Sequence, residues 1–283
     1  MYGLSWRSSV AGTSHLLVLP DSGFDTALRR CYSSCVTVLL TNDDGILSPG
    51  LKALEEAFAQ DHEVWVVAPD GERSGFSNSI TLSEPIRCTR VGERSYAISG
   101  TPADCVILAT LGAIPVMPDL VVSGINIGAN LGSDIVYSGT CAGARQAAYK
   151  KIPGIAVSLN SFHAPFHFEP VCSFLTGHVQ ELMDLWDEGH FININVPNLT
   201  SYRGVEITTP AMRLYQDRLL PFEPPRGGTY YFVDGRPEPA ELEPGTDWYA
   251  VEQGHLSVSP IMLNPVNHEV ERHYRTSGLV RGS

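Results

Sequence analysis

The sequence has no long apolar run and few basic residues, and both shortages exclude classes of protein. No stretch approaches the roughly 20 consecutive apolar residues that a membrane-spanning helix needs, so we expect no membrane partner. Lysine and arginine number 19 against 31 acidic residues, which gives a net charge of -12. Binding to a nucleic-acid duplex relies on clustered cations, so a duplex is not the expected partner. An anionic substrate would need a metal ion or oriented backbone N–H groups.

Paired cysteine motifs are also missing. No C-x-x-C unit occurs, and the single C-x3-C spacing has no second pair or histidine cluster to complete it. The six cysteines are scattered, at Cys31, Cys35, Cys88, Cys105, Cys141 and Cys172. This pattern is typical of free thiols in a reducing compartment, and we expect a cytoplasmic protein. A G-x-S-x-G motif or other nucleophile–base signature is absent as well.

The two ends differ from the middle of the chain, and we exclude both from the predicted fold. Residues 1–35 form an N-terminal extension rich in serine and arginine, and its apolar segment 15–20 is too short for a signal-peptide core. A transit peptide and a translated upstream extension both stay open. Residues 266–283 form a tail, and its last residues, SGLVRGS (277–283), resemble a protease-site linker left from cloning.

From residue 36 onward, segments typical of strands and helices alternate. Apolar and β-branched runs predict strands over 36–41, 62–69, 118–124, 154–159 and 191–197. Helices are predicted over 49–60, after the N-cap Ser48, over 101–113, with Thr101 as N-cap and Asp104 at the third position, over 138–151 and around 170–187. Repeated strand–helix–strand units predict an α/β fold, with a parallel sheet and helices on both faces.

The character of the chain changes after about residue 200. Prolines are too frequent between residues 210 and 244 for long helices. We therefore expect strands, hairpins and an arm attached to the α/β core, within a single domain over 36–265 whose arm covers about 205–250.

Four polar, glycine-rich segments follow predicted strands or open predicted helices. They are 41–45 (TNDDG), 68–79 (APDGERSGFSNS), 122–132 (VSGINIGANLG) and 137–140 (YSGT). Ligands of parallel α/β sheets bind beyond the carboxyl ends of the strands, so these segments indicate one functional site.

Asp43 and Asp44 are the strongest candidates for chemistry in these segments. Two adjacent carboxylates repel each other unless a cation lies between them. Mg²⁺ or Mn²⁺ takes oxygen ligands and would neutralise the pair. The dipeptide alone fits equally well a loop in which one aspartate caps the turn and the other is solvated.

Two further segments can complete such a site. Ser74 can supply a hydroxyl ligand and Arg73 a phosphate contact, although in isolation their segment is more typical of a polar turn. Asn126 can place an amide oxygen in the metal shell, and its glycine-rich surroundings fit a tight turn as well. Ser138, Gly139 and Thr140 open a helix whose N-terminus favours phosphate, and simple capping by Ser138 predicts the same pattern.

Taken together and in this order, the motifs resemble those of the survival protein E (SurE) family of metal-dependent 5'/3'-nucleotidases. The resemblance covers roughly residues 36–265, and an ordered set of motifs is far more specific than any one of them. It is carried by LLTNDDGILSPGL, VVAPDGERSGFSNSIT, GTPADCV, DLVVSGINIGANLG, YSGTCAGA and PGTDWYAVEQGHLSVSPI.

The resemblance implies a Rossmann-like three-layer core with a mostly parallel sheet and an oligomerising, proline-rich C-terminal arm. It also implies hydrolysis of nucleoside 5'- and 3'-monophosphates, and a homodimer or homotetramer. The family's metal ligands fall on Asp43, Asp44, Ser74 and Asn126, and we expect one divalent cation per subunit, Mg²⁺ or Mn²⁺.

Within this interpretation, an aspartate of the pair orients or deprotonates the attacking water. Asn126, Ser138, Gly139, Thr140 and Arg73 are the expected phosphate-binding residues. Hydrolysis of phosphate monoesters is very slow without a catalyst, so positioning and charge stabilisation must supply most of the acceleration.

Two other functions fit an acidic pair after the first strand. A phosphatase that works through a phosphoaspartate usually needs an Asp-x-Asp arrangement, whereas Asp43 and Asp44 are adjacent. A metal-dependent receiver module is not an enzyme, is about half this length, and expects a late lysine that residues 154–161 do not provide. Trapping with beryllium fluoride separates these classes, because only aspartyl-phosphate chemistry gives a covalent mimic.

Overall fold

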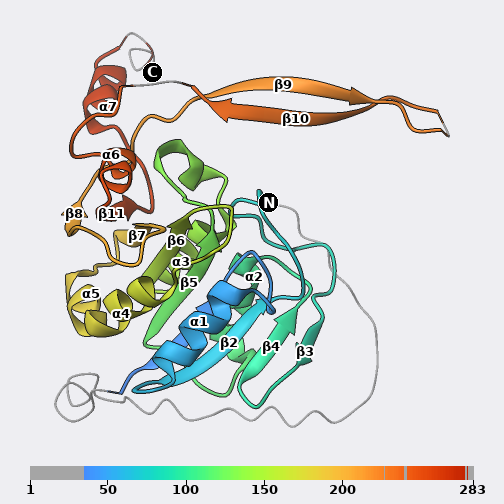
Figure 1. Ribbon diagram of the computed structural model, residues 1–283, viewed down its shortest axis with the longest axis vertical. Coiled ribbons are helices and arrows are strands. Elements are labelled where there is room, and N and C mark those ends of the chain that lie inside the picture. Colours follow the sequence, from blue (N-terminus) through green and yellow to red (C-terminus); the bar gives the residue numbers. More distant parts are fainter. Residues whose placement is uncertain (1–34, 226, 239–240, 278, 280–283) are drawn as a thin grey trace. The chain divides into compact units, whose positions relative to one another are not determined.

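A computed structural model describes residues 35–225, 227–238, 241–277 and 279 (Figure 1). The N-terminal extension predicted over residues 1–35 lies outside the described residues, apart from Cys35. Within the predicted tail, residues 278 and 280–283 lie outside them as well. The account below concerns the described residues.

A nine-stranded sheet forms the centre of the fold. In spatial order its strands are β3 (Cys88–Arg90), β4 (Ser95–Ile98), β2 (Glu63–Pro69), β1 (Thr37–Thr41), β5 (Leu120–Ile127), β6 (Gly154–Asn160), β7 (His190–Pro197), β11 (Leu256–Met262) and β8 (Val205–Ile207). Neighbours from β4 to β7 run parallel, as do β11 and β8. The pairs β3–β4 and β7–β11 are antiparallel. The sheet is therefore mostly parallel, as predicted.

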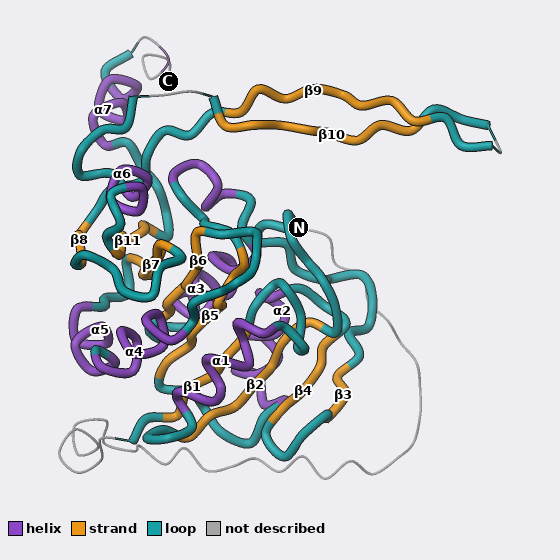
Figure 2. Tube along the Cα trace, in the orientation of Figure 1, coloured by secondary structure: helices purple, strands orange, loops and turns teal. Residues whose placement is uncertain are grey.

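Helices pack on both faces of this sheet (Figure 2). They are α1 (Pro49–Phe58), α2 (Pro102–Leu108) with a π-helical turn at Ala109–Ala113, α3 (Gly139–Tyr149), α4 (Glu169–Gly177), α5 (Val179–Leu185), α6 (Asp247–Glu252) and α7 (His268–Arg275). None of the helices in the described part of the chain is both long enough and apolar enough to cross a membrane.

The two cores explain the three-layer arrangement. Alternate residues of a strand point to opposite faces of the sheet. Leu40 of β1 accordingly packs with Phe58 of α1 and with side chains of α4 and α5. Its neighbour Leu39 packs on the other face, with Val106 of α2 and Ala147 of α3. This confirms the predicted α/β fold.

Local capping signals fix the starts of the first two helices as predicted. The Ser48 hydroxyl accepts a hydrogen bond from the N–H of Leu51, and Pro49 is the first helical residue. Thr101 and Asp104 form a capping box, in which each side chain accepts from the other residue's N–H. Each bond satisfies an N–H that has no partner within the helix.

Strand β5 corrects one prediction. We expected a strand over 118–124 followed by a glycine-rich turn, but the strand continues to Ile127. After a register shift that follows Ser123, Asn126 pairs with Ser158 and Ile127 with Leu159 of β6. Asn126 is therefore held by the sheet itself, which makes its position more rigid than that of a loop residue.

The C-terminal part adds a separate two-stranded hairpin (Figure 1). Its antiparallel strands are β9 (Tyr215–Phe222) and β10 (Tyr230–Pro237). The prolines of this part of the chain disfavour long helices, and it forms a hairpin instead. The segment that we treated as a tail also contains a helix, α7, whose N-cap is Asn267.

Candidate active site

The turn after β1 presents the two adjacent aspartates. The Asn42 side chain donates to the carbonyl oxygen of Gly45 at 3.0 Å and accepts from its N–H at 3.2 Å. Asn42 is fully buried, so this pair of bonds closes the turn firmly around Asp43 and Asp44. The sequence TNDDG thus folds into a turn that Asn42 closes by bonding to Gly45, and this turn carries the two aspartates.

Asp43 lies against the N-terminus of α3. Its carboxylate oxygen Oδ1 accepts a hydrogen bond of 2.5 Å from the Thr140 hydroxyl. A Cβ atom at Gly139 would lie 2.8 Å from both Cβ and Oδ2 of Asp43, so only glycine fits beside this carboxylate. Asp43 is 4% exposed. Burial raises its pKa, although the Thr140 hydrogen bond partly opposes that rise.

Asp44 points to β5. Its Oδ2 accepts a hydrogen bond of 3.3 Å from the N–H of Ile127, the residue after Asn126. Burial, followed by the negative charge of Asp43, raises the pKa of Asp44 from its ordinary value of 3.8 to about 7. The charge of Glu72 raises the pKa of both aspartates further. It is therefore unfavourable for both carboxylates to be charged at once, and a cation placed between them would offset this cost.

The loop after β2 brings Ser74 to the same place. The Ser74 hydroxyl donates to the Glu72 carboxylate at 2.5 Å. The backbone N–H of Arg73 donates to the carbonyl oxygen of Asp43 at 2.7 Å, which ties this loop to the acidic turn. Sequence reasoning did not single out Glu72, which here orients the Ser74 side chain.

The guanidinium of Arg73, expected to contact phosphate, has protein partners in this structure. Its guanidinium forms an ion pair with Asp70 at 2.8 Å and donates to the Ser99 carbonyl oxygen at 3.2 Å. Arg73 is not among the residues that line the pocket described below. The contact that Arg73 makes with the acidic turn comes from its backbone N–H, which bonds to Asp43.

Asn126 and Ser138 are oriented by their own hydrogen bonds. The Asn126 amide nitrogen donates to the Gly128 carbonyl oxygen at 2.8 Å, so its amide oxygen is the atom offered to a ligand. The Ser138 hydroxyl oxygen accepts from the Cys141 N–H at 3.0 Å as the N-cap of α3. Its own hydrogen stays available as a donor.

One pocket of about 770 Å³ collects these residues. Asp43, Ser74, Asn126 and Ser138 all line it, although they come from four separate segments of the chain. The volume lies in the range of small-molecule and cofactor sites, and it is much larger than one phosphate group requires.

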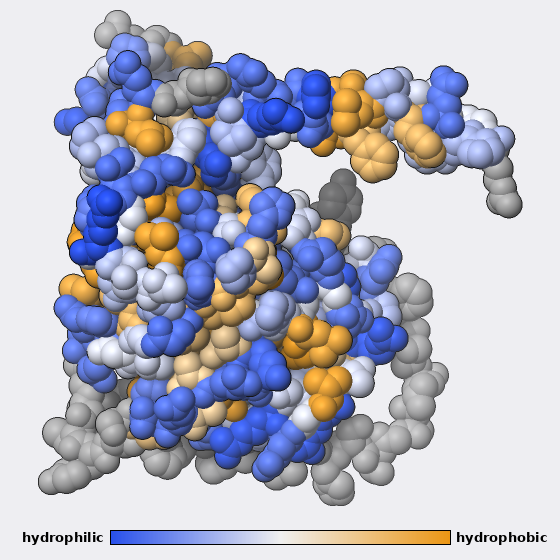
Figure 3. Space-filling model, viewed as in Figure 1, coloured by the Kyte–Doolittle hydropathy of each residue, from blue (hydrophilic) through white to orange (hydrophobic). Residues whose placement is uncertain are grey.

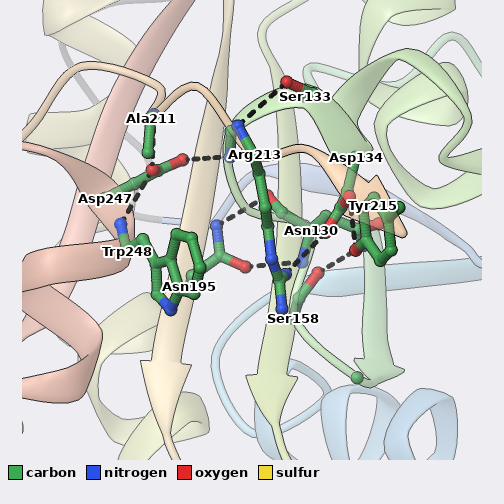
Figure 4. Close-up of polar contacts among 12 residues, drawn as sticks. Asn130, Ser133, Asp134, Ser158, Asn195, Ala211, Arg213, Tyr215, Asp247 and Trp248 are labelled. Atoms are coloured by element: carbon green, nitrogen blue, oxygen red, sulfur yellow. Dashed lines mark hydrogen bonds and ion pairs between the residues drawn. The ribbon is translucent and has the colours of Figure 1, made fainter. Parts of the chain in front are cut away.

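Another wall of the pocket was missed by the sequence analysis. Arg213, Leu214 and Tyr215 line it at the start of the hairpin, together with Asp134 from the segment before α3. Figure 4 shows Arg213 and Tyr215 both directed at Asp134. Phe162, after β6, lines the pocket too. No motif in the sequence signals these residues, because they meet only in the folded chain.

The donor set fits a hard divalent cation. Among the residues described, no three histidine, cysteine, aspartate or glutamate side chains lie close enough together to hold a metal ion. A cation here would therefore need the Ser74 hydroxyl and the Asn126 amide oxygen beside the two aspartates. All four are oxygen donors, which Mg²⁺ and Mn²⁺ prefer. The raised pKa values of the buried pair support the same conclusion.

Comparison with known proteins agrees with this chemistry. The family described as Survival protein SurE matches residues 38–217. A relative from Citrifermentans bemidjiense, named 5'-nucleotidase SurE, is 40% identical over 238 residues, which cover 82% of this chain and 94% of the relative. A protein of the same name from Alkalilimnicola ehrlichii is 42% identical over 230 residues, covering 80% and 89%. The crystal structure of the SurE protein from Aquifex aeolicus superposes with a TM-score of 0.74 at 37% identity, covering 84% of this chain and 98% of that one.

Proposed function

Because the chain belongs to the SurE family, we propose that it is a metal-dependent nucleotidase that hydrolyses nucleoside 5'- and 3'-monophosphates to nucleoside and phosphate. The observation that carries this proposal is the pocket in which Asp43, Ser74, Asn126 and Ser138 meet. It combines an oxygen-only cation site with a helix N-terminus, the two features that a phosphomonoester needs.

Asp43, Asp44, Ser74 and Asn126 would hold one divalent cation per subunit, Mg²⁺ or Mn²⁺. When bound, the cation supplies positive charge that offsets the acidic pair and polarises a phosphoryl oxygen. The turn clamped by Asn42 fixes the two carboxylates before any cation binds. The strand position of Asn126 does the same for the amide oxygen.

We assign the proton chemistry to Asp43. Its carboxylate lines the pocket, whereas that of Asp44 faces the Ile127 N–H. In this proposal Asp43 orients and deprotonates the water that attacks phosphorus opposite the departing ester oxygen. The P–O ester bond breaks as the new P–O bond forms. The leaving alkoxide takes a proton from solvent to give the nucleoside hydroxyl, and Asp43 returns to solvent the proton that it took from the attacking water.

We assign phosphate binding to the start of α3, with one change from the expected set. The Thr140 hydroxyl donates to Asp43, so Thr140 positions the carboxylate. Ser138, through its hydroxyl hydrogen, and Gly139, through its backbone N–H, are the donors proposed for the phosphate, together with the second N–H of the Asn126 amide, the first being bonded to Gly128. The macrodipole of α3 adds to their effect. We leave Arg73 out, because its guanidinium is bonded to Asp70.

We further propose that the hairpin mediates assembly into a homodimer or homotetramer. An isolated two-stranded hairpin is marginal in water. This hairpin nevertheless carries large apolar side chains that are exposed, and Figure 3 shows hydrophobic residues along it. Phe232 and Val233 are 65% and 73% exposed. A second copy of the chain would bury them.

A cytoplasmic location is supported by the thiols. Cys88, Cys105, Cys141 and Cys172 are free. Free thiols persist in a reducing compartment.

A phosphate-release screen tests the proposal. Purified protein is incubated with nucleoside 5'- and 3'-monophosphates, with chelator and with added Mg²⁺ or Mn²⁺. We expect release that requires the added cation and that is largely lost in Asp43→Asn. The exposed Asp61→Asn is the control for the loss of one charge. Full release by exhaustively dialysed protein in excess chelator would overturn the metal-dependent reading. A covalent beryllium fluoride adduct on an aspartate would favour phosphoaspartate chemistry instead.

A further inference from the structure

The base of the hairpin forms part of the pocket. Strand β9 begins at Tyr215 and β10 ends at Pro237, and the N–H of Glu238 donates to the Leu214 carbonyl oxygen at 2.8 Å across this end. Leu214, Tyr215 and Glu238 all line the pocket. One structural element therefore carries both the exposed apolar strands and a wall of the candidate active site.

Buried Asp247 fixes this wall in place. Its carboxylate accepts from the N–H groups of Gly132, Ala211 and Trp248 at 2.7, 2.9 and 2.8 Å (Figure 4). These three donors belong to the segment after β5, the segment before β9 and helix α6. A fully buried carboxylate that accepts three N–H groups joins the three segments at one point. The approach to the hairpin is thus anchored to the rim of the pocket.

Asp134 then orients the ring of Tyr215. The Tyr215 hydroxyl donates to Oδ1 of Asp134 at 2.7 Å, and the Arg213 guanidinium donates to Oδ2 at 2.6 Å. The Arg213 guanidinium also lies 4.8 Å from the centre of the Trp248 ring. Its charge is therefore already compensated, and Arg213 acts here as a brace. Burial, followed by the hydrogen bond to Asp134, raises the pKa of Tyr215 to about 12, so its hydroxyl stays a donor.

A second aromatic side chain lines the same pocket. Phe162 is 74% exposed, yet its ring lies close to the backbone at Gly128, where a Cβ atom would be 2.4 Å from the ring. The Arg213 guanidinium lies 5.7 Å from the centre of the Tyr215 ring. Aromatic rings that line a polar pocket can receive a nucleobase, because every base presents a π-face.

We propose that Tyr215 and Phe162 contact the nucleoside part of the substrate, and that Tyr215 is a specificity-determining residue supplied by the hairpin. This inference rests on the proposed nucleotidase function. It assigns the region around Asp43 and Ser138 to the phosphate and the aromatic wall to the base and sugar. Selectivity for a nucleoside over a smaller alcohol would then come from the hairpin rather than from the metal site.

The test compares two substrates, a nucleoside 5'-monophosphate and glycerol phosphate, which has no base to stack. For Tyr215→Ala and for Phe162→Ala, we expect the ratio of the two kcat/KM values to fall about 5- to 100-fold, the range for loss of one base–aromatic stack. The loss should lie in KM, with kcat for the nucleotide nearly unchanged. Tyr215→Phe keeps the ring, so the same ratio should fall only about two- to twelvefold, as expected for the loss of one hydrogen bond.

Tyr231→Ala is the matched control, because Tyr231 is an exposed tyrosine of the same hairpin, in β10. We expect its substrate ratio to equal that of the wild type. Phe162→Ala changes an exposed side chain, so it keeps the test decisive if Tyr215→Ala fails to fold.

Equal losses on both substrates would overturn the inference, as would an unchanged ratio or an equal effect of Tyr231→Ala. If the wild type hydrolyses neither substrate, the proposed function itself is overturned.

Discussion

Replacing Asp44 by asparagine should make the metal-free protein more stable at pH 8. The pKa of Asp44 is raised from 3.8 to about 7 by burial and by the charge of Asp43. The folded protein therefore keeps a proton that the unfolded chain releases. The contribution of Asp44 to the free energy of unfolding is fully present below about pH 4 and is lost as the pH rises to about 7. Above that, the wild type carries a charge that its fold disfavours.

The size of the effect follows from the same values. A pKa difference of about 3 corresponds to about 4 kcal/mol, at about 1.4 kcal/mol per pKa unit. Solvent reaches part of Asp44, which reduces the cost of its charge, so we expect a gain of about 1–2 kcal/mol at pH 8. Asparagine keeps an oxygen that can accept from the Ile127 N–H, so the hydrogen bond need not be lost. The gain should shrink by more than half between pH 8 and pH 5.

Urea unfolding in excess chelator measures this gain directly, at pH 5 and pH 8. Asp61→Asn, at an exposed position, removes the same charge from the surface and should change stability little. With excess Mg²⁺ or Mn²⁺ the order should reverse, because the cation stabilises the folded wild type by mass action and binds the variant less tightly. An Asp44→Asn protein that is no more stable than the wild type at pH 8 in chelator would refute this reasoning.

Three other predictions follow from the structure. Chelator should abolish phosphate release and Mg²⁺ or Mn²⁺ should restore it, as a release assay after dialysis will check. Thr140→Val should lower the free energy of unfolding by about 1–3 kcal/mol, because it removes the side-chain donor of a buried carboxylate, whereas Thr140→Ser and the helical control Thr176→Val should cost much less. A chain in which a short glycine–serine linker replaces residues 216–236 should sediment as a smaller species than the full chain at micromolar concentration, and a monomeric full chain would contradict the proposed assembly.

The parts of the fold that depend on local signals were predictable from the sequence. Ser48 and Thr101 begin their helices because their side chains cap N–H groups only three residues away. Apolar runs placed the parallel strands for a similar reason, since burial on both faces leaves a continuous pattern. The acidic turn was predictable as well, because two adjacent carboxylates need an explanation wherever they occur.

The remainder depended on contacts between distant segments. The glycine-rich surroundings of Asn126 predict a turn, because its pairing with Ser158 of β6 arises only when the sheet forms. The sequence predicts a phosphate contact for Arg73 and does not report its partners Asp70 and Ser99, since these are set by how the loop folds back. Arg213 and Tyr215 meet Asp134 across 79 and 81 residues, a separation that no periodicity reports.

The close approach of Gly139 to Asp43 means that the candidate site depends on the absence of a side chain at position 139. A methyl group at this position would have to displace either the carboxylate or the first turn of α3. Gly139→Ala would leave every ligand, donor and acceptor of the pocket in the chain and change only their spacing. The position of the Asp43 carboxylate is therefore limited sterically by α3, the helix proposed to bind the phosphate. One substitution can thus change the spacing of groups at the candidate site without changing its charge, and another can change the charge without changing the spacing.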